Sequence, residues 1–112
     1  MKKVIWLGNS RQRLRDFPLA ARRVLGQELL KVQLGGHPVD WRPMPIIGTG
    51  SIEVRIHGPQ EYRLIYVASY PKAVYVLHCF AKKTQSTSLN DLRIARTKYG
   101  EIEKLRDKAG EP

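Results

Sequence analysis

The second half of the chain carries side chains that could bind a phosphate and move a proton. Four of the cations between residues 55 and 83 are the candidates, namely Arg55, Arg63, Lys82 and Lys83. A guanidinium group suits a phosphate because it donates to two oxygens in a fixed fork. His78 has an ordinary pKa that suits proton transfer near neutral pH. Metal-free cleavage of RNA needs such groups, because the attacking 2′-hydroxyl loses a proton and the developing phosphorane charge must be stabilised.

The sequence around these cations predicts the strands that hold them. Two runs rich in Val, Ile, Leu and Tyr flank residues 69–72, which is typical of a β-hairpin. The second run, 73–81, is almost continuously apolar, which predicts a strand covered on both faces. In an antiparallel pair, the start of one strand lies beside the end of the other. We therefore expect Arg63, Lys82 and Lys83 to cluster at one end of the sheet.

The cations also have ordinary structural interpretations. Arg63 could be a solvated strand arginine or form a salt bridge with Glu53 or Glu61. The two lysines could protect a strand edge.

His78 has a structural alternative as well. It alternates with Val74, Val76 and Phe80, so the pattern places it on their face. A histidine among apolar neighbours is more often a hydrogen-bonded core residue than a catalyst.

Periodicity predicts the elements of the first half of the chain. We expect strands at 3–8 and 51–57. A short basic turn at 11–15 precedes a helix that begins at Leu19 and stops at Gly35.

The connection 37–50 contains three prolines and shows no periodic pattern, so we expect a loop anchored by Trp41 and Met44. A last helix starts after Ser88, which with Asp91 resembles a capping box. Gly100 weakens that helix by about 1 kcal/mol relative to alanine and could bend or end it.

These elements predict one α+β domain over residues 1–112. Its small antiparallel sheet has about four strands, with the N-terminal helical region packed on one face. The other face is left partly open and bounded by the C-terminal helix, and the tail 107–112 is expected to fray.

The charge of the chain favours a polyanionic partner. Its formal net charge is +10, from 20 Lys and Arg against 10 Asp and Glu. Nucleic acid is the first candidate, an anionic membrane surface the second and an acidic protein the third. One group of arginines could lie against an RNA backbone or form a solvated basic face. This group consists of Arg11, Arg13, Arg15, Arg22 and Arg23.

Other classes of site find little support in the sequence. His37, His57 and His78 lie on separate elements without the spacing of metal ligands, and we expect no metal and no cofactor. The single cysteine, Cys79, fits a reduced, cytoplasmic setting. No apolar run approaches the roughly 20 residues that span a bilayer, so we expect no membrane partner.

Four segments together resemble the RelE/ParE toxin superfamily, and most closely its phage-derived HigB-like branch. They are IEVRI at 52–56, YRLIY at 62–66, VLHCFAKKTQ at 76–85 and Ala95-Arg96 on the last helix. The opening VIWLG and the helix end QLG are similar to that branch too. The likeness covers about residues 3–105.

The resemblance assigns roles to several of the cations. Arg63 matches the arginine that contacts the scissile phosphate in RelE-like nucleases, and Lys83 takes the place of a second catalytic basic residue. Arg55 lies near the position of a lysine base, and Leu89 stands roughly where a catalytic tyrosine is found. Arginine is a poor base, so His78 becomes a candidate, since HigB-type toxins use histidine and acidic residues near the last strand.

The resemblance implies the toxin of a type II toxin–antitoxin pair. As a metal-independent mRNA endonuclease, it would inhibit translation, with mRNA and the ribosome as partners. Its antitoxin would be a helix-turn-helix protein with an acidic segment, through which alone the toxin would reach operator DNA. Two alternatives stay open: a non-nucleolytic ParE-like inhibitor of DNA gyrase, and an inactive RNA- or antitoxin-binding homologue.

Overall fold

The structure is a computed structural model that describes residues 1–82 and 86–111. Within these residues the elements are, in chain order, β1 (Lys3–Trp6), α1 (Ser10–Arg15), α2 (Leu19–Gln33), β2 (Trp41–Pro43), β3 (Ser51–Ile56), β4 (Glu61–Val67), β5 (Ala73–Lys82) and α3 (Leu89–Lys108). The predicted α+β class is confirmed. The described residues contain no helix of the length and apolarity that crossing a membrane requires.

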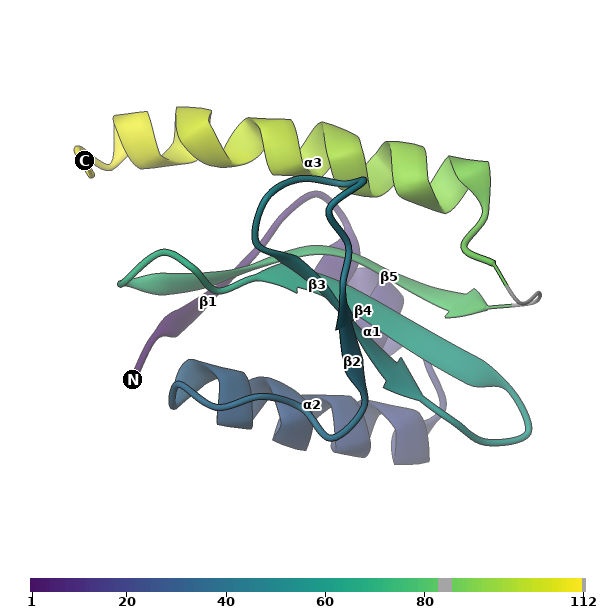
Figure 1. Cartoon of the computed structure of the whole chain (residues 1–112). Coiled ribbons are helices and arrows are strands. Elements are labelled where there is room, and N and C mark those ends of the chain that lie inside the picture. The colour runs from purple at the N-terminus through teal and green to yellow at the C-terminus, as the bar shows by residue number, and fades with distance from the viewer. Residues whose placement is uncertain (83–85, 112) are drawn as a thin grey trace.

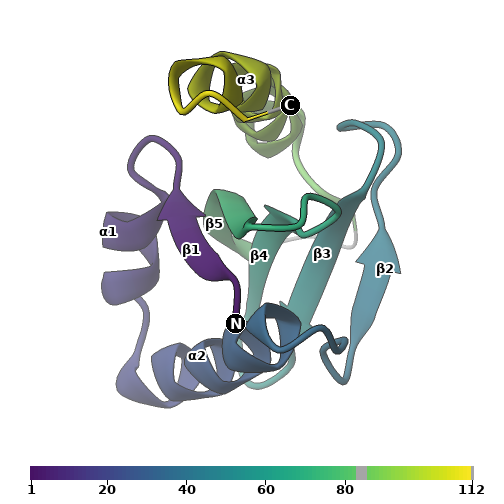
Figure 2. The same ribbon diagram turned by 90° about the vertical axis from the view of Figure 1, so that its left-hand side faces the viewer.

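The strands form one sheet in the order β1-β5-β4-β3-β2 (Figure 2). β5 lies between two strands, as its continuous apolarity predicts. The sheet has five strands rather than about four, because β2 forms within the predicted loop 37–50. Three residues are too few to show alternation, and β2 is defined by its pairing with β3, where Trp41 lies opposite Val54.

One pair of strands departs from the predicted antiparallel sheet. β1 runs parallel to β5, with Lys3 opposite Ala73, whereas the other three pairs are antiparallel. A parallel pair needs a long crossover, and the two helices and three strands between β1 and β5 supply it.

The two longer helices cover opposite faces of the sheet (Figure 1). α2 packs Leu25 on the face that contains Leu64. α3 packs Ala95 and Ile102 on the face that contains Ile65, so the face predicted to be partly open is covered along β5. Because α3 is held to the sheet on both sides of its glycine, it continues through that residue to Lys108.

A β-bulge in β5 changes the face on which its histidine lies. Ile65 is opposite His78 while Tyr66 is opposite Val76, so Leu77 is an extra residue in β5. Leu77 and Phe80 belong to the core under α3, and Val76 belongs to the core under α2. The prediction that His78 shares one face with Val74, Val76 and Phe80 is therefore wrong for the two valines, because the bulge reverses the alternation, and right for Phe80, on which His78 stacks.

The segment after β2 is anchored by Met44, as predicted, and not by Trp41. The structure buries Met44 and Ile47 in the core, whereas Trp41 is 36% exposed and stacks on His37. α3 binds the same segment, since Tyr99 Oη donates to the Thr49 carbonyl at 2.7 Å.

Candidate functional site

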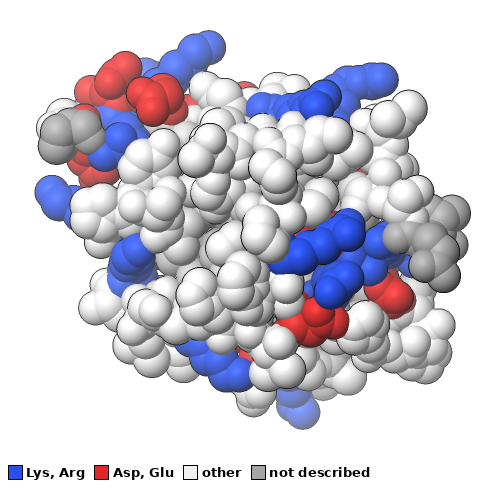
Figure 3. Space-filling view, in the orientation of Figure 1, with Lys and Arg blue, Asp and Glu red and all other residues white. Residues whose placement is uncertain are grey.

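The predicted cations meet at one end of the sheet, as strand pairing requires. Lys82 lies opposite Glu61, and Arg63 lies opposite both Phe80 and, on the other neighbour, Arg55. Figure 3 shows Lys and Arg side chains gathered beside acidic ones on the visible face. The expected clustering of Arg63 with Lys82 is confirmed, while Lys83 lies outside the described residues.

Arg63 is engaged in ion pairs rather than open to solvent. Its side chain is 3% exposed, and its two terminal nitrogens donate to Glu53 and Glu61. The salt-bridge alternative is therefore the geometry observed. A phosphate could contact this guanidinium only by replacing a carboxylate, and Glu61 is the more accessible of the two at 37% exposed.

Glu53, which the sequence offered as a salt-bridge partner of Arg63, is the centre of a larger buried network. Its carboxylate is fully buried and also accepts from Arg42 Nε and Thr87 Oγ1, both at 3.2 Å. Burying a carboxylate is costly unless charge and hydrogen bonds compensate it, and these donors do so. We call Arg42, Glu53, Glu61, Arg63 and Thr87 the arginine network. It connects three strands to the residues just before α3.

Arg55 also has a carboxylate partner. Its Nε donates to Asp40 Oδ1 at 3.0 Å, and His57 Nε2 contacts the other oxygen of the same carboxylate. The hydrogen bond from His57, followed by that from Arg55, lowers the pKa of Asp40 despite partial burial. The hydrogen bond from Arg63 lowers the pKa of Glu61 in the same way.

Lys82 differs from these arginines. It is partly exposed, and within the described residues no carboxylate lies within ion-pair distance of its ammonium group. Burial, and then the positive charge of Arg63, lower the pKa of Lys82. An ammonium group with a lowered pKa gives up its proton more readily, so Lys82 combines positive charge with acidity.

His78 has the surroundings of a hydrogen-bonded core residue. It is 1% exposed, stacks on Phe80 and donates from Nε2 to Asp91 Oδ1 at 2.8 Å. Burial lowers the pKa of His78, and the bond to Asp91 offsets this only in part. His78 is therefore neutral at neutral pH, with its proton on Nε2. Ser88 Oγ donates to the second oxygen of Asp91 at 2.6 Å.

The five N-terminal arginines do not share one surface. Arg13 Nε donates to the Cys79 carbonyl at 2.6 Å. This carbonyl lies on β5 beyond the residues that pair with β1, so Arg13 supplies the hydrogen bond that a strand partner would make there. Arg11, Arg15 and Arg23 are exposed, and Arg22 is half-buried. Three of the five are thus exposed to solvent, while Arg13 is held beside β5 through its Nε.

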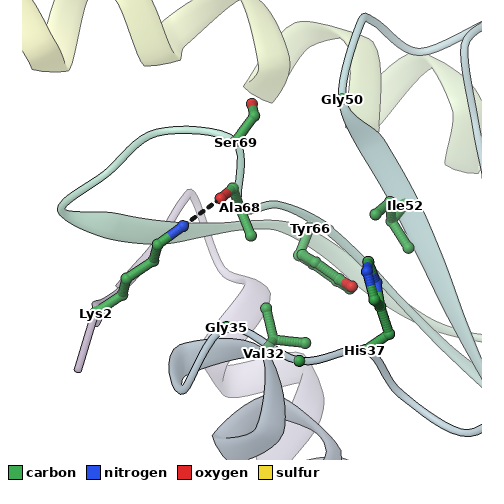
Figure 4. Close-up of a pocket in the computed structure, with 10 residues that line it drawn as sticks. Lys2, Val32, Gly35, His37, Gly50, Ile52, Tyr66, Ala68 and Ser69 are labelled. Atoms are coloured by element: carbon green, nitrogen blue, oxygen red, sulfur yellow. Dashed lines mark hydrogen bonds between the residues drawn. The ribbon is translucent and has the colours of Figure 1, made fainter.

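A hollow lies at the opposite end of β4 and offers little chemistry. It has a volume of about 220 Å³ and is bordered by Lys2, His37 and Tyr66 (Figure 4). The Lys2 ammonium group donates a hydrogen bond to the Ala68 carbonyl. Burial raises the pKa of Tyr66 to about 12, so its phenol stays protonated.

The described residues contain no group of three His, Cys, Asp or Glu side chains that could hold a metal ion. Burial raises the pKa of Cys79 to about 12, so this thiol is not a nucleophile at neutral pH.

Residues 12–100 match the family described as Phage derived protein Gp49-like (DUF891). This range begins within α1 and includes every element that contributes to the arginine network. The family is known in toxin–antitoxin contexts. No curated protein matches the chain.

Proposed function

We propose that this chain, which belongs to the Gp49-like family of phage-derived proteins, is the toxin of a type II toxin–antitoxin pair. In this proposal it inhibits translation by cutting mRNA on the ribosome without a metal. Family membership supports the toxin, and the net charge of +10 supports a polyanionic target. An acidic segment of a helix-turn-helix antitoxin would neutralise that charge.

The observation that carries the nuclease proposal is the position of Lys82. It brings a partly exposed ammonium group of lowered pKa to the end of the sheet where Arg63 and Arg55 lie. Cleavage by the RNA 2′-hydroxyl needs positive charge at the phosphate and an acid for the leaving oxygen. Lys82 has the properties for both tasks.

Arg63 would join this site through partner exchange. A phosphate that displaces Glu61 would take up the freed half of the guanidinium group, while Glu53 keeps hold of the other half. Bidentate binding of phosphate by arginine makes the exchange chemically reasonable.

The burial of Arg63 favours a second candidate, a non-nucleolytic toxin that inhibits DNA gyrase. If both carboxylates stay bound, the guanidinium group serves the fold alone and the basic surface binds a protein target.

Induction of the chain without its antitoxin, with mapping of mRNA 5′ ends, tests the proposal. New 5′ ends within translated messages support the nuclease, whereas intact mRNA with relaxed or broken DNA supports the gyrase inhibitor. Lys82→Met and Lys83→Ala are each expected to abolish growth inhibition at equal expression. Full toxicity of both variants would place the site elsewhere.

A further inference from the structure

A pocket of about 280 Å³ lies between α1, the end of β5 and the start of α3. Its lining includes two cations from different elements, Arg13 and Lys82, together with the hydroxyl group of Ser88 and the carboxylate of Asp91. Two cations, a hydroxyl and one carboxylate are the groups that a phosphodiester with an adjacent hydroxyl would need. We call this hollow the Asp91 pocket.

The cations of this pocket retain capacity for a ligand. Within the described residues, the Arg13 guanidinium group donates from Nε to the Cys79 carbonyl, so its two terminal nitrogens are available to a ligand. Among the described residues, no carboxylate lies within ion-pair distance of the Lys82 ammonium group. The first backbone N–H groups of α3, a helix of 20 residues, add positive potential at the same place.

Hydrogen bonds to both carboxylate oxygens fix the position of the Asp91 side chain. Its Oδ1 accepts from the buried His78 and its Oδ2 accepts from Ser88, while its side chain is 18% exposed. Each carboxylate oxygen has a second lone pair, so both can still accept a proton or a hydrogen bond from a ligand. A capping role alone would need only Ser88 and the backbone N–H of Asp91.

The buried His78, which donates to Asp91, is a second indication of a ligand-binding site. Its Nδ1 is buried and has no hydrogen-bond partner among the described residues. An unpaired buried nitrogen is unfavourable, and an apolar side chain would fill this position without that cost. The arrangement is explained if His78 serves to orient the Asp91 carboxylate toward the pocket.

We propose that the Asp91 pocket binds the scissile phosphodiester of RNA, with Asp91 as the general base, His78 as its positioning residue, and Arg13 and Lys82 on the phosphate. This inference rests on the proposed nuclease function and names its missing base. Asp91 takes the proton of the 2′-hydroxyl, the 2′-oxygen forms a bond to phosphorus, and the bond from phosphorus to the 5′-oxygen breaks. The leaving oxygen takes a proton from the Lys82 ammonium group. The products are a 2′,3′-cyclic phosphate and a 5′-hydroxyl end.

Cleavage of a short RNA on ribosomes by the full-length protein tests the catalytic step. Asp91→Asn keeps the size of the side chain and the Ser88 cap but removes the base, so it is expected to lower kcat by about 10²–10⁴-fold with little change in KM. Asp107→Asn, an exposed position on the same helix, is the matched control and should cleave normally. Lys82→Arg keeps the charge but is a poor acid, so it should lose kcat more than affinity. Cleavage by Asp91→Asn at the normal rate would overturn the proposal.

Binding of a 2′-O-methyl RNA oligonucleotide tests the pocket independently of cleavage. This probe cannot react, so its contacts can be mapped from NMR amide shifts of the full-length protein. Shifts at Arg13, Lys82 and Asp91, lost in Lys82→Met, support the pocket even if the natural chain cuts no RNA. In that case the nuclease function fails while the binding site stands. Shifts confined to Arg11 and Arg15 would overturn the pocket itself.

Discussion

The arginine network and the Asp91 pocket each surround a carboxylate, but the two carboxylates differ in burial and in the groups that bind them. Glu53 is fully buried and is bound by Arg42, Arg63 and Thr87. Asp91 is partly exposed and is bound by one buried imidazole and one hydroxyl. The first arrangement leaves the carboxylate no freedom to react, whereas the second fixes a carboxylate in position and leaves it accessible.

The cations differ in the same way between the two regions. Both terminal nitrogens of Arg63 donate to carboxylates, while Lys82 at the pocket has no carboxylate partner in the described part of the chain. A cation that is already paired stabilises the fold, and a cation that is unpaired and partly desolvated is available to a ligand. Charge in the sequence therefore does not by itself identify the site, because pairing decides which cations can act.

The largest expected effect is the loss of the buried carboxylate in the arginine network. Glu53→Gln keeps the shape but leaves Arg63 and Arg42 without the charge that compensates them. Removal of one partner of a buried pair costs about 3–5 kcal/mol, which urea denaturation would measure as a lower midpoint. A loss below about 1 kcal/mol would mean that the network contributes little to the fold.

Ser88→Ala tests the pocket's contribution to stability and should have a smaller effect. Ser88 accepts from the backbone N–H of Asp91 at 3.1 Å and so caps α3. Loss of such a cap costs about 1 kcal/mol. Thr97→Ala, in the exposed middle of the same helix, is the control and should change the free energy of unfolding far less. An equal loss in both variants would show that the cap is not the source.

The sequence predicts that the cations cluster and offers Glu53 and Glu61 as salt-bridge partners of Arg63, but it does not decide between pairing and solvent exposure. The long apolar run of β5 and the hairpin connection set the register that brings Arg63 beside Lys82. The pairing of Arg63 with Glu53 depends on the register between β3 and β4, which alternation in either strand alone does not fix.

Asp91 was recognised only as a partner in a helix cap. Its approach to His78 depends on the turn between β5 and α3 and on the bulge at Leu77, and neither leaves a signal in the periodicity. β2 was missed for a related reason, since its three residues are defined by pairing and not by pattern.

The two regions are also expected to lose stability in different pH ranges. Burial lowers the pKa of His78 below its unfolded value of about 6.5, so the unfolded chain binds this proton more readily. The stability that His78 contributes is thus present above about pH 6.5 and is lost as pH falls toward its folded pKa. Carboxylates of lowered pKa, such as Glu61 and Asp40, lose theirs only below about pH 4.5.

Urea denaturation at several pH values would measure this difference. The free energy of unfolding is expected to fall between pH 7 and pH 5.5, and His78→Leu should flatten that part of the curve. A slope that persists in His78→Leu would assign it to another group.

The smallest expected effect lies at the outer edge of the arginine network. Glu61 is 37% exposed, so Glu61→Gln should cost less than about 1 kcal/mol of stability, because exposed ion pairs contribute little. The same change frees half of the Arg63 guanidinium group and removes a negative charge beside Lys82. If a phosphate replaces Glu61 when RNA binds, the variant should bind 2′-O-methyl RNA several-fold more tightly, with the gain reduced at high salt. Unchanged affinity would mean that Arg63 never leaves its carboxylates, and phosphate recognition would then belong to the Asp91 pocket alone.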